Sequence, residues 1–439
     1  MSHDIEQHTP APSPTRRTVL TGAAWSVPVI AAASLAPLAT ASGTPVLTFN
    51  QSTYTGAACS TITDAYVSVT VNGVATAGTG VTTTLSGGYT FAGGATSYAG
   101  VSDTSGKVTL PAINVPASGG TSSVTAATGS TNSSATVQGT ANSTAKTWYT
   151  SASSAGSYSN VPVGSTPVGW LTFLAPNGDL YYNNARIDTN VTSAVTDHTE
   201  PGSGYQRDFI SLVSNGTAKT YYSSQSGAPN AWNGIPRGSK AIGWVTWLAP
   251  NGDLYYGGNV LAQNVTSATA DHRENGTGYS RDFLSFVSNG KAYVWYSGSA
   301  GIEAKANVPT GSKAVGWLTF LAPNGDLYYN NTLLDTNVTS ARNDHTEPGS
   351  GYQRDFISLV SNGTAKAYYS SQSGGPTAWS GIPTGSTAIG WATWLAPNGD
   401  LYYNGSLLAK NVAYATAQHN ENGTGFSRDF LTYTPYSAC

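Results

Sequence analysis

The sequence predicts an all-β fold whose carboxyl-terminal two-thirds closes into a ring of repeated strands. Three observations lead to this prediction: a long phrase recurs at a nearly fixed period, short apolar runs are broken by Asn-Gly turns, and helical periodicity is absent. Of the 439 residues, 9% are charged and 39% are hydrophobic. This composition is typical of folded β-sheets with hydroxyl- and amide-rich surfaces, and not of disorder.

The amino terminus, residues 1–41, has the features of an export signal. Thr15-Arg16-Arg17-Thr18-Val19-Leu20 is similar to a twin-arginine motif, an apolar stretch follows to about Ala36, and Ala39-Thr40-Ala41 offers a cleavage site. The alternative is an uncleaved membrane anchor. No later segment is long and apolar enough to span a bilayer. We therefore expect an extracellular bacterial protein, secreted or associated with the cell surface, with no membrane span after cleavage.

Charge and cysteine content narrow the partners further. The formal net charge is −3 and the pI is about 6.0, so no basic surface indicates nucleic-acid binding. Cys59 and Cys439 are the two cysteines, and outside the cytoplasm they could form a disulfide, although two free thiols remain an alternative. No Cys/His spacing is typical of a metal site, and no cofactor is expected.

Residues 42–130 predict a β-sandwich. Tyr66-Val67-Ser68-Val69-Thr70-Val71 alternates apolar and hydroxyl residues and is followed by an Asn72-Gly73 turn. The segment 100–110, Gly-Val-Ser-Asp-Thr-Ser-Gly-Lys-Val-Thr-Leu, resembles the late strands of bacterial immunoglobulin-like domains of the invasin type. That resemblance implies a spacer or stalk. Residues 131–146 are rich in Ser, Thr, Asn and Ala and predict a flexible linker.

Residues 147–439 contain four repeats of about 73 residues. Trp170, Trp244, Trp317 and Trp391 each begin the phrase Trp-x-Thr-[Phe/Trp]-Leu-Ala-Pro-Asn-Gly-Asp-Leu-Tyr-Tyr. A weaker echo of the phrase lies inside each repeat, so four large units or eight short ones are both compatible with the sequence. The four copies of about 73 residues are called repeats one to four, in chain order.

The two ends of the repeat region complement each other. The region opens at Lys146-Thr-Trp-Tyr-Thr with the second strand of an echo unit, and the missing first strand is found at 428–433, Arg-Asp-Phe-Leu-Thr-Tyr. In a ring, this offset lets the last strand pair with the first incomplete unit, so that no sheet edge is left unpaired. In an open solenoid the two ends do not meet, so the offset would have no such effect. The sequence therefore predicts a closed β-propeller of four or eight blades.

The repeated phrase resembles the blades of tachylectin-2-type β-propeller lectins. The match covers about a dozen residues in each repeat, at 170–182, 244–256, 317–329 and 391–403. The resemblance implies binding of amino sugars at equivalent sites. The chain departs from that family in its longer period and in Asp188-Thr-Asn-Val-Thr, which replaces a Gly-Lys-Leu-Tyr-Lys-Gly segment, so the expected fold rests on firmer ground than the ligand.

Every histidine beyond the signal segment, and four of the five glutamates beyond it, lie in one motif, His-x-Glu-x-Gly-x-Gly-[Tyr/Phe]-x-Arg-Asp-Phe. Carboxylates and Arg can hydrogen-bond sugar hydroxyls, an aromatic ring can stack on a sugar, and the glycines leave the backbone open to a ligand. Alternatively, the Arg-Asp dipeptide and the His and Glu residues brace the scaffold. The candidate residues are His198, Glu200, Tyr205, Arg207, Asp208, His272, Glu274, Tyr279, Arg281, Asp282, His345, Glu347, Tyr352, Arg354, Asp355, His419, Glu421, Phe426, Arg428 and Asp429. Trp232 and Trp379, in exposed-looking loops, are further stacking candidates.

These features favour multivalent binding of glycans from cell surfaces or polysaccharides. A glycoside hydrolase using Glu200 and Asp208 as its acid and base is an alternative. Catalysis needs one intact site, whereas all four repeats keep the His, Glu, Arg and Asp residues, so we expect a binding protein and not an enzyme. A structural or adhesive protein whose ring contacts another protein is the second alternative.

Overall fold

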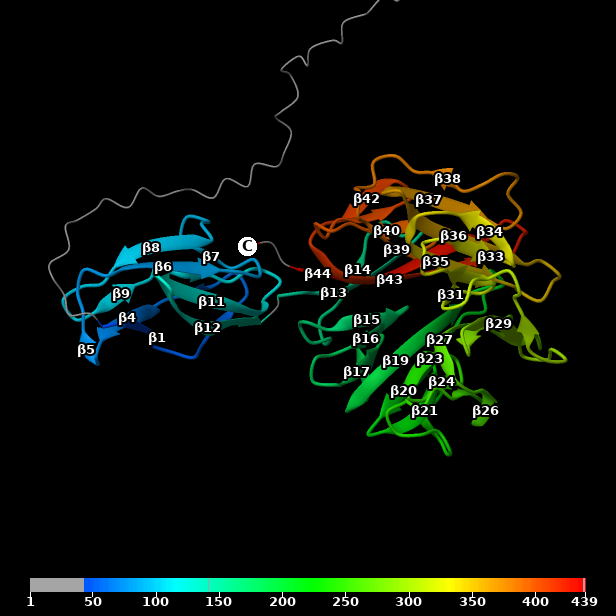
Figure 1. Ribbon diagram of the computed structural model, residues 1–439. Helices are drawn as coiled ribbons and strands as arrows, with labels where there is room; N and C mark the ends of the chain where they lie inside the picture. The colour runs from blue at the N-terminus through cyan, green and yellow to red at the C-terminus, as the bar shows by residue number, and fades with distance from the viewer. Residues whose placement is uncertain (1–42, 141, 437–438) are drawn as a thin grey trace, which may run out of the picture. The chain divides into compact units, whose positions relative to one another are not determined.

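The structure, a computed structural model, describes residues 43–140, 142–436 and 439 (Figure 1). Residues 44–439 form one compact unit. The described part of the chain contains 44 β-strands and no α-helix, which confirms the all-β prediction. The expected export signal at residues 1–41 lies outside the described residues. None of the described segments forms a helix of the length and hydropathy needed to cross a membrane.

The amino-terminal module contains three sheets. Their strand orders are β1-β4-β5 with β9 also paired to β4, β3-β10-β7, and β2-β12-β11-β6-β8. The strands are β1 (Pro45–Phe49), β2 (Thr53–Ala57), β3 (Thr61–Ile62), β4 (Tyr66–Val71), β5 (Val74–Ala75), β6 (Gly80–Leu85), β7 (Thr90–Phe91), β8 (Ser97–Val101), β9 (Lys107–Thr109), β10 (Ile113–Asn114), β11 (Gly120–Thr128) and β12 (Thr131–Thr140).

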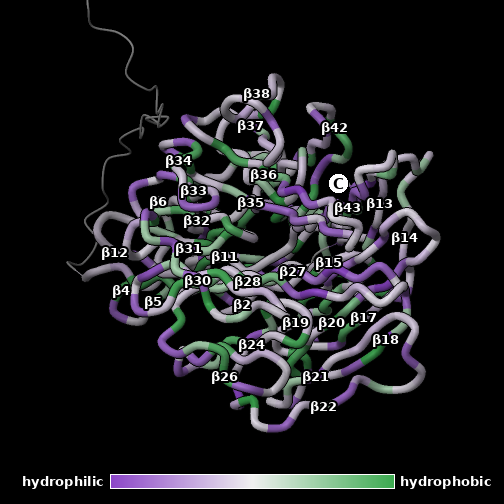
Figure 2. Tube along the Cα trace, turned by 90° about the vertical axis from the view of Figure 1, so that its right-hand side faces the viewer, coloured by the Kyte–Doolittle hydropathy of each residue, from purple (hydrophilic) through white to green (hydrophobic). Residues whose placement is uncertain are grey.

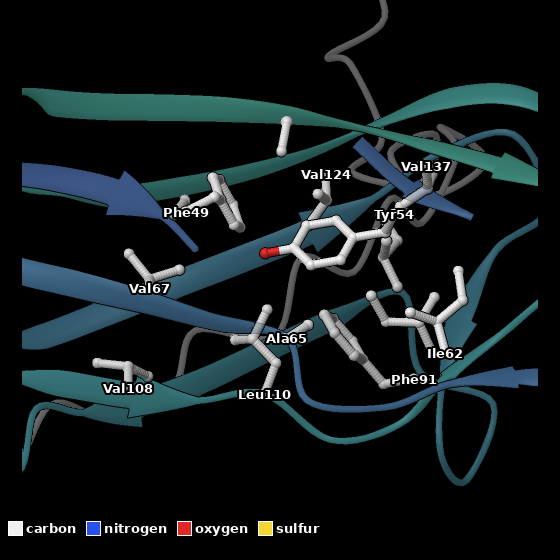
Figure 3. Packing of buried hydrophobic residues seen from close by; sticks show 14 of the residues in the cluster. Phe49, Tyr54, Ile62, Ala65, Val67, Phe91, Val108, Leu110, Val124 and Val137 are labelled. Atoms are coloured by element: carbon white, nitrogen blue, oxygen red, sulfur yellow. The ribbon is translucent and has the colours of Figure 1, made fainter. Parts of the chain in front are cut away.

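One hydrophobic core serves all three sheets of this module. The alternation that predicted β4 places Val67 and Val69 in the interior, since successive side chains of a strand point to opposite faces. Figure 3 shows the Tyr54 ring in the middle of the cluster, and its hydroxyl donates a 2.7 Å hydrogen bond to Asn50 Oδ1. The buried tyrosine therefore keeps a partner for its polar end.

The predicted linker over 131–146 is wrong for most of its length. Residues 131–140 form β12, which pairs antiparallel with β11 and parallel with β2. The segment was read as flexible because it is rich in Ser, Thr and Asn, but Ala135 and Val137 alternate with those polar residues and point into the core. In a half-buried strand, two such residues on one face are enough to specify the pairing.

The repeat region consists of eight sheets of four strands each. The sheets that carry the repeated Trp phrase are β15 (Thr166–Gly169), β16 (Thr172–Leu174), β17 (Leu180–Tyr182), β18 (Ala185–Asp188); β23 (Lys240–Gly243), β24 (Thr246–Leu248), β25 (Leu254–Tyr256), β26 (Asn259–Ala262); β31 (Lys313–Gly316), β32 (Thr319–Leu321), β33 (Leu327–Tyr329), β34 (Thr332–Asp335); and β39 (Thr387–Gly390), β40 (Thr393–Leu395), β41 (Leu401–Tyr403), β42 (Ser406–Ala409).

The other four sheets carry the His motif. They are β19 (Val191–Thr199), β20 (Arg207–Ser214), β21 (Thr217–Tyr222), β22 (Asn230–Trp232); β27 (Val265–Glu274), β28 (Ser280–Ser288), β29 (Lys291–Tyr296), β30 (Glu303–Ala304); β35 (Val338–Thr346), β36 (Arg354–Ser361), β37 (Thr364–Tyr369), β38 (Thr377–Ala378); and β43 (Val412–Glu421), β44 (Ser427–Pro435), β13 (Ala145–Tyr149), β14 (Gly156–Tyr158).

The last of these sheets joins the two ends of the repeat region. Its strand order is β14-β13-β44-β43, and β13 pairs antiparallel with β44 from Lys146 opposite Tyr433 to Tyr149 opposite Phe430. Figure 1 shows β13 beside the red strand β44. The pairing of the late strand with the incomplete first unit, expected from the sequence, is confirmed.

The turn after each tryptophan of the repeated phrase connects two strands of one sheet and also bonds to the preceding sheet. The residue that follows the tryptophan, for example Val245, has a φ of 45°, a region that branched residues rarely adopt. The Val245 amide donates to Ser211 Oγ of the preceding sheet at 3.0 Å, and the Trp244 amide donates to Asp197 Oδ2 at 2.9 Å. These bonds hold the unusual turn in place and connect one sheet to the next.

Buried apolar side chains fill the space between sheets in several small clusters. One cluster contains Val213, Ile235 and Trp247, and another contains Val287, Phe320 and Trp317. Figure 2 shows the same pattern as short green stretches spread over many strands, with purple and white segments between them. The core of the repeat region is therefore divided among the sheet interfaces.

The structure pairs the two cysteines as a disulfide, Cys59–Cys439, between residues 380 positions apart in the sequence. Of the two alternatives that the sequence left open, the disulfide is therefore the one that forms.

Candidate binding site

The His motif of each repeat lies on one hairpin, with its histidine on the first strand and its Arg-Asp dipeptide on the second. In repeat one the hairpin is β19–β20, and His198 is paired with Asp208. The same register recurs on β27–β28, β35–β36 and β43–β44. The hairpin therefore places the histidine opposite the aspartate in the same way four times.

Each motif histidine is buried between two carboxylates. His198 Nδ1 donates to Asp208 Oδ1 at 2.8 Å, and His198 Nε2 lies 3.6 Å from Glu200 Oε2. The other oxygen of Asp208 accepts a 2.5 Å bond from the Tyr182 hydroxyl. The equivalent His–Asp distances in the other repeats are 2.9, 3.0 and 2.8 Å.

The carboxylates decide the charge of the histidine. Burial alone would lower the pKa of His419, but hydrogen bonding and charge from Asp429 and Glu421 raise it to about 9. The pKa values of the three equivalent histidines are also raised. His419 is therefore a cation at neutral pH, neutralised by a buried aspartate and a half-buried glutamate, and the same pair of carboxylates favours the protonated form of the other three histidines.

Each glutamate also binds the arginine of a neighbouring repeat. Arg207 pairs with Glu274 at 3.2 Å, Arg281 with Glu347 at 2.8 Å, Arg354 with Glu421 at 3.1 Å, and Arg428 with Glu200 at 2.7 Å. The last pair joins repeat four to repeat one. The four ion pairs thus form a continuous cycle that links every repeat to the next.

The glycine-rich loops interlock with the motif aromatic residues. Gly276 has a φ of 74°, and a Cβ atom there would overlap the ring of Tyr205 from the preceding repeat. Tyr279 lies against Gly349, Tyr352 against Gly423, and Phe426 against Gly202 in the same way. The expectation that the motif glycines leave the backbone open to a ligand is therefore wrong for the first glycine of each motif, because its space is occupied by a ring. The second glycine of each motif has nothing within 4 Å of where a Cβ atom would lie; these are Gly204, Gly278, Gly351 and Gly425.

Burial divides the predicted site residues into two groups. The motif histidines and aspartates are only 1–6% exposed, and each histidine Nδ1 bonds its aspartate, whereas its buried Nε2 has no hydrogen-bond partner. Their burial favours the scaffold alternative, and their assignment as glycan ligands stays a prediction. The motif arginines, in contrast, keep 25–33% of their side chains exposed. Of the motif, the arginines and the aromatic edges beside them remain accessible.

A tyrosine that the sequence analysis did not select completes the exposed surface. The Arg207 guanidinium lies 5.3 Å from the ring centroids of both Tyr205 and Tyr222, at cation–π distance. We call this unit of one motif arginine, its motif aromatic residue and the tyrosine of the next strand the tyrosine–arginine site. The other three contain Arg281 with Tyr279 and Tyr296, Arg354 with Tyr352 and Tyr369, and Arg428 with Phe426 and Tyr149.

The additional tyrosines are the most exposed members of these sites. Tyr149, Tyr296 and Tyr369 are 36–38% exposed, and Tyr222 is half-buried. Beside Tyr149 lies a cavity of about 430 Å³, which is also lined by Trp170, Tyr158 and several serines of 151–154. The sequence contains one feature that could have identified these tyrosines. An aromatic pair follows each Asn-Gly turn of the echo, and Tyr222 is the second residue of the pair in repeat one.

The two loop tryptophans are not open stacking surfaces. Trp232 and Trp379 are half-buried, and their rings pack 5.8 and 5.9 Å from the buried rings of Trp247 and Trp394. Trp232 Nε1 also donates to Thr220 Oγ1. Their indole rings pack against a buried tryptophan of the following sheet, and their role as stacking surfaces for a ligand stays a prediction.

Within residues 43–140, 142–436 and 439, no three His, Cys, Asp or Glu side chains are placed to hold a metal ion.

Comparisons with known proteins identify no family. No protein-family model and no curated protein matches the chain. One similar solved structure is a structural genomics protein of unknown function from Bacteroides thetaiotaomicron VPI-5482, at 9% identity over 89% of this chain and 98% of that one, with a TM-score of 0.25. Another is invasin, a bacterial integrin-binding protein, at 13% identity over 90% of this chain and 74% of that one, with a TM-score of 0.19. TM-scores this low do not establish a common fold. The chain is an all-β, repeat-rich protein, and its resemblance to tachylectin-2-type blades stays a prediction.

Proposed function

We propose that this protein is an exported, multivalent carbohydrate-binding protein that binds a sugar at each of its four tyrosine–arginine sites. The observation that carries the proposal is the fourfold occurrence of an accessible tyrosine beside a partly exposed arginine, with the same geometry each time. Sites of this kind that serve only the fold would not need to keep the tyrosine at the surface.

The chemistry of the site suits a sugar. The apolar face of a pyranose stacks on an aromatic ring, and the planar guanidinium donates to paired hydroxyls. One Nη atom of each arginine is bound to a glutamate, which fixes the direction of the remaining donors. Four weak sites on one molecule would raise the overall affinity for a surface by avidity.

We further propose that the repeat region is a closed eight-bladed β-propeller and that the amino-terminal module is an immunoglobulin-like stalk. Eight four-stranded sheets, the β13–β44 pairing and the cycle of Arg–Glu pairs support the ring. The disulfide supports export, since disulfides persist in oxidising compartments. Folding before export would suit a twin-arginine signal. The near-identity of the four sites supports binding over catalysis.

The test is a glycan-array screen of the full chain against a variant in which Tyr149, Tyr222, Tyr296 and Tyr369 are all replaced by alanine. We expect saturable binding to one class of sugar, lost in the variant. The matched control replaces the exposed apolar residues Val260, Leu333 and Leu407 on the outer strands with serine, and it should bind like the parent.

Circular dichroism and thermal unfolding establish that each variant is folded. If no glycan binds, or if the folded tyrosine variant binds as well as the parent, the proposal is wrong. A structural or adhesive protein that contacts a protein partner would then be the better explanation of the repeats.

A further inference from the structure

A second cavity lies among the innermost strands of the repeat region, away from the tyrosine–arginine sites. Its volume is about 410 Å³, and it is lined by residues from β15, β19, β23, β27, β31, β35, β39 and β43, one strand from each of the eight sheets. Because all repeats contribute to one space, the cavity exists once per chain. Its volume is within the range of small-molecule sites.

The repeats differ from one another where they line this cavity. Residues 168–219 and 315–366, from repeats one and three, differ at five positions, and two of these are Val195 and Thr196, which become Arg342 and Asn343. All four residues line the cavity. The position of Asp197 is likewise occupied by Gln418 in repeat four. Repeats one and three, nearly identical over this stretch, have thus become unequal where they line the shared cavity.

Several buried polar atoms, on residues that line the cavity, have no hydrogen-bond partner. They include Asn343 Oδ1, Gln418 Oε1 and Thr196 Oγ1, on residues that are 1%, 8% and 2% exposed. Arg342 Nε is a buried hydrogen-bond donor that also lacks a partner. Unpaired buried polar atoms are unfavourable and rare in folded proteins, and a bound polar molecule would satisfy them.

Opposite charges line different parts of the cavity wall. Arg342, from repeat three, forms no ion pair with a carboxylate of the described residues. Burial raises the pKa of the nearby Asp344, and the positive charge of Arg342 offsets part of that rise. Asp197 and Asp271 come from repeats one and two. Burial and the charge of Asp271 raise the pKa of Asp197 to about 7, so a cation placed between these two carboxylates would relieve their repulsion.

Arg273 contacts one of the aspartates that line the cavity, since its Nη2 lies 4.0 Å from Asp271 Oδ1. Its guanidinium donates to the carbonyl of His198 and to Asn420 Oδ1, so that it spans repeats two, one and four. Arg273 lies two residues beyond Asp271 on β27, on the side of the His motif. Arg273 lines the much smaller space that the motif glutamates surround, and that space shares no lining residue with the cavity.

We propose that this cavity binds one small zwitterion per chain, with its anionic group at Arg342 and its cationic group between Asp197 and Asp271. The planar guanidinium suits a carboxylate, and the two aspartates suit an ammonium group. The unpaired oxygens of Asn343, Gln418 and Thr196 accept the remaining donors of the ligand. The site is independent of the proposed glycan sites, since it shares no residue with them.

The test is isothermal titration calorimetry of the full chain with glycine, L-alanine and L-lysine as probes. Acetate and methylammonium, which carry one charge each, are the control ligands. We expect saturable binding of at least one zwitterion with a stoichiometry of one, and no saturable binding of either control ligand at the same concentration.

The chain itself supplies the matched variant. Replacing Arg342 by Val and Asn343 by Thr gives repeat three the lining of repeat one, so this variant is expected to fold. Loss of a charge-assisted hydrogen bond predicts a roughly 10- to 100-fold lower affinity. The absence of binding by all three zwitterions, or unchanged affinity in the variant, overturns the proposal.

The glycan-array result of the same variant separates the two proposals. Its tyrosine–arginine sites are intact, so its glycan binding should equal that of the parent chain. A stoichiometry of four for the zwitterion would place it at the tyrosine–arginine sites and would also overturn the cavity assignment.

Discussion

His419 is held between Asp429 and Glu421, and this position predicts how the protein responds to alkaline pH. The imidazole is almost fully buried, with Nδ1 2.8 Å from Asp429 Oδ1 and Nε2 3.6 Å from Glu421 Oε2. The two carboxylates stabilise its protonated form in the folded protein only. Above the pKa of the folded state the proton is lost, and the stabilisation is lost with it.

The size of the effect follows from the two pKa values. The pKa is about 9 in the folded protein against 6.5 for an ordinary histidine. The difference of about 2.5 pH units, at about 1.4 kcal/mol for each unit, corresponds to about 3 kcal/mol. Because the folded pKa is raised, this contribution is fully present below pH 6.5 and disappears as the pH rises through 9. The other motif histidines act in the same direction.

The assay is urea unfolding of the parent chain and of the His419→Gln variant at several pH values from 6 to 10. The free energy of unfolding of the parent should fall by about 3 kcal/mol more than that of the variant over this range. The partner Tyr403 does not interfere, because burial and the charge of Asp429 raise the pKa of its hydroxyl well above this range. Equal pH dependence in the two proteins would refute the reasoning.

Three further predictions follow from other contacts. Gly276→Ala should destabilise the protein by roughly 1–3 kcal/mol more than Gly278→Ala in thermal or urea unfolding. Both glycines have a positive φ, but only Gly276 touches the tyrosine ring of the preceding repeat. Equal losses of stability in the two variants would show that the backbone conformation alone matters. Replacing Cys59 and Cys439 by serine should lower the free energy of unfolding by about 2–4 kcal/mol, and a reducing agent should then affect the parent chain but not the variant. Asp197→Asn should stabilise the protein at pH 8 by up to about 4 kcal/mol and have little effect at pH 4. The pKa of Asp197 is raised to about 7 in the folded protein, so the folded state of the parent chain loses stability as the pH rises from about 4 to 7. A variant no more stable than the parent chain at pH 8 would contradict this.

The fold was largely predictable because its signals are local. The Asn-Gly turns set the hairpins, and the offset between Lys146 and the strand at 428–433 predicted the β13–β44 pairing. The segment 131–140 was missed because its composition resembles a linker. Its strand character depends on Ala135 and Val137 reaching a core made by distant strands, which composition does not reveal.

The site was predicted only in part because its contacts run between repeats. The sequence places His198 near Glu200, but it cannot show that Glu200 binds Arg428 from a strand 228 residues later. Nor can it show that Tyr205 fills the space above Gly276. Tyr222 was overlooked because one tyrosine among many in β-strands carries no signal until the structure places Arg207 beside it.

The pairing of β13 with β44 has a consequence for biosynthesis. Tyr149 is synthesised 281 residues before its partner Phe430. At a translation rate of about 5–20 residues per second, β13 waits roughly 15 to 60 seconds on the ribosome with one edge uncovered. An uncovered edge can pair with other chains, so a chaperone or the short length of β13 must protect it during that time. Late completion would also give a quality-control point, since a chain released before β44 has been synthesised would keep an unpaired edge that proteases and chaperones can detect.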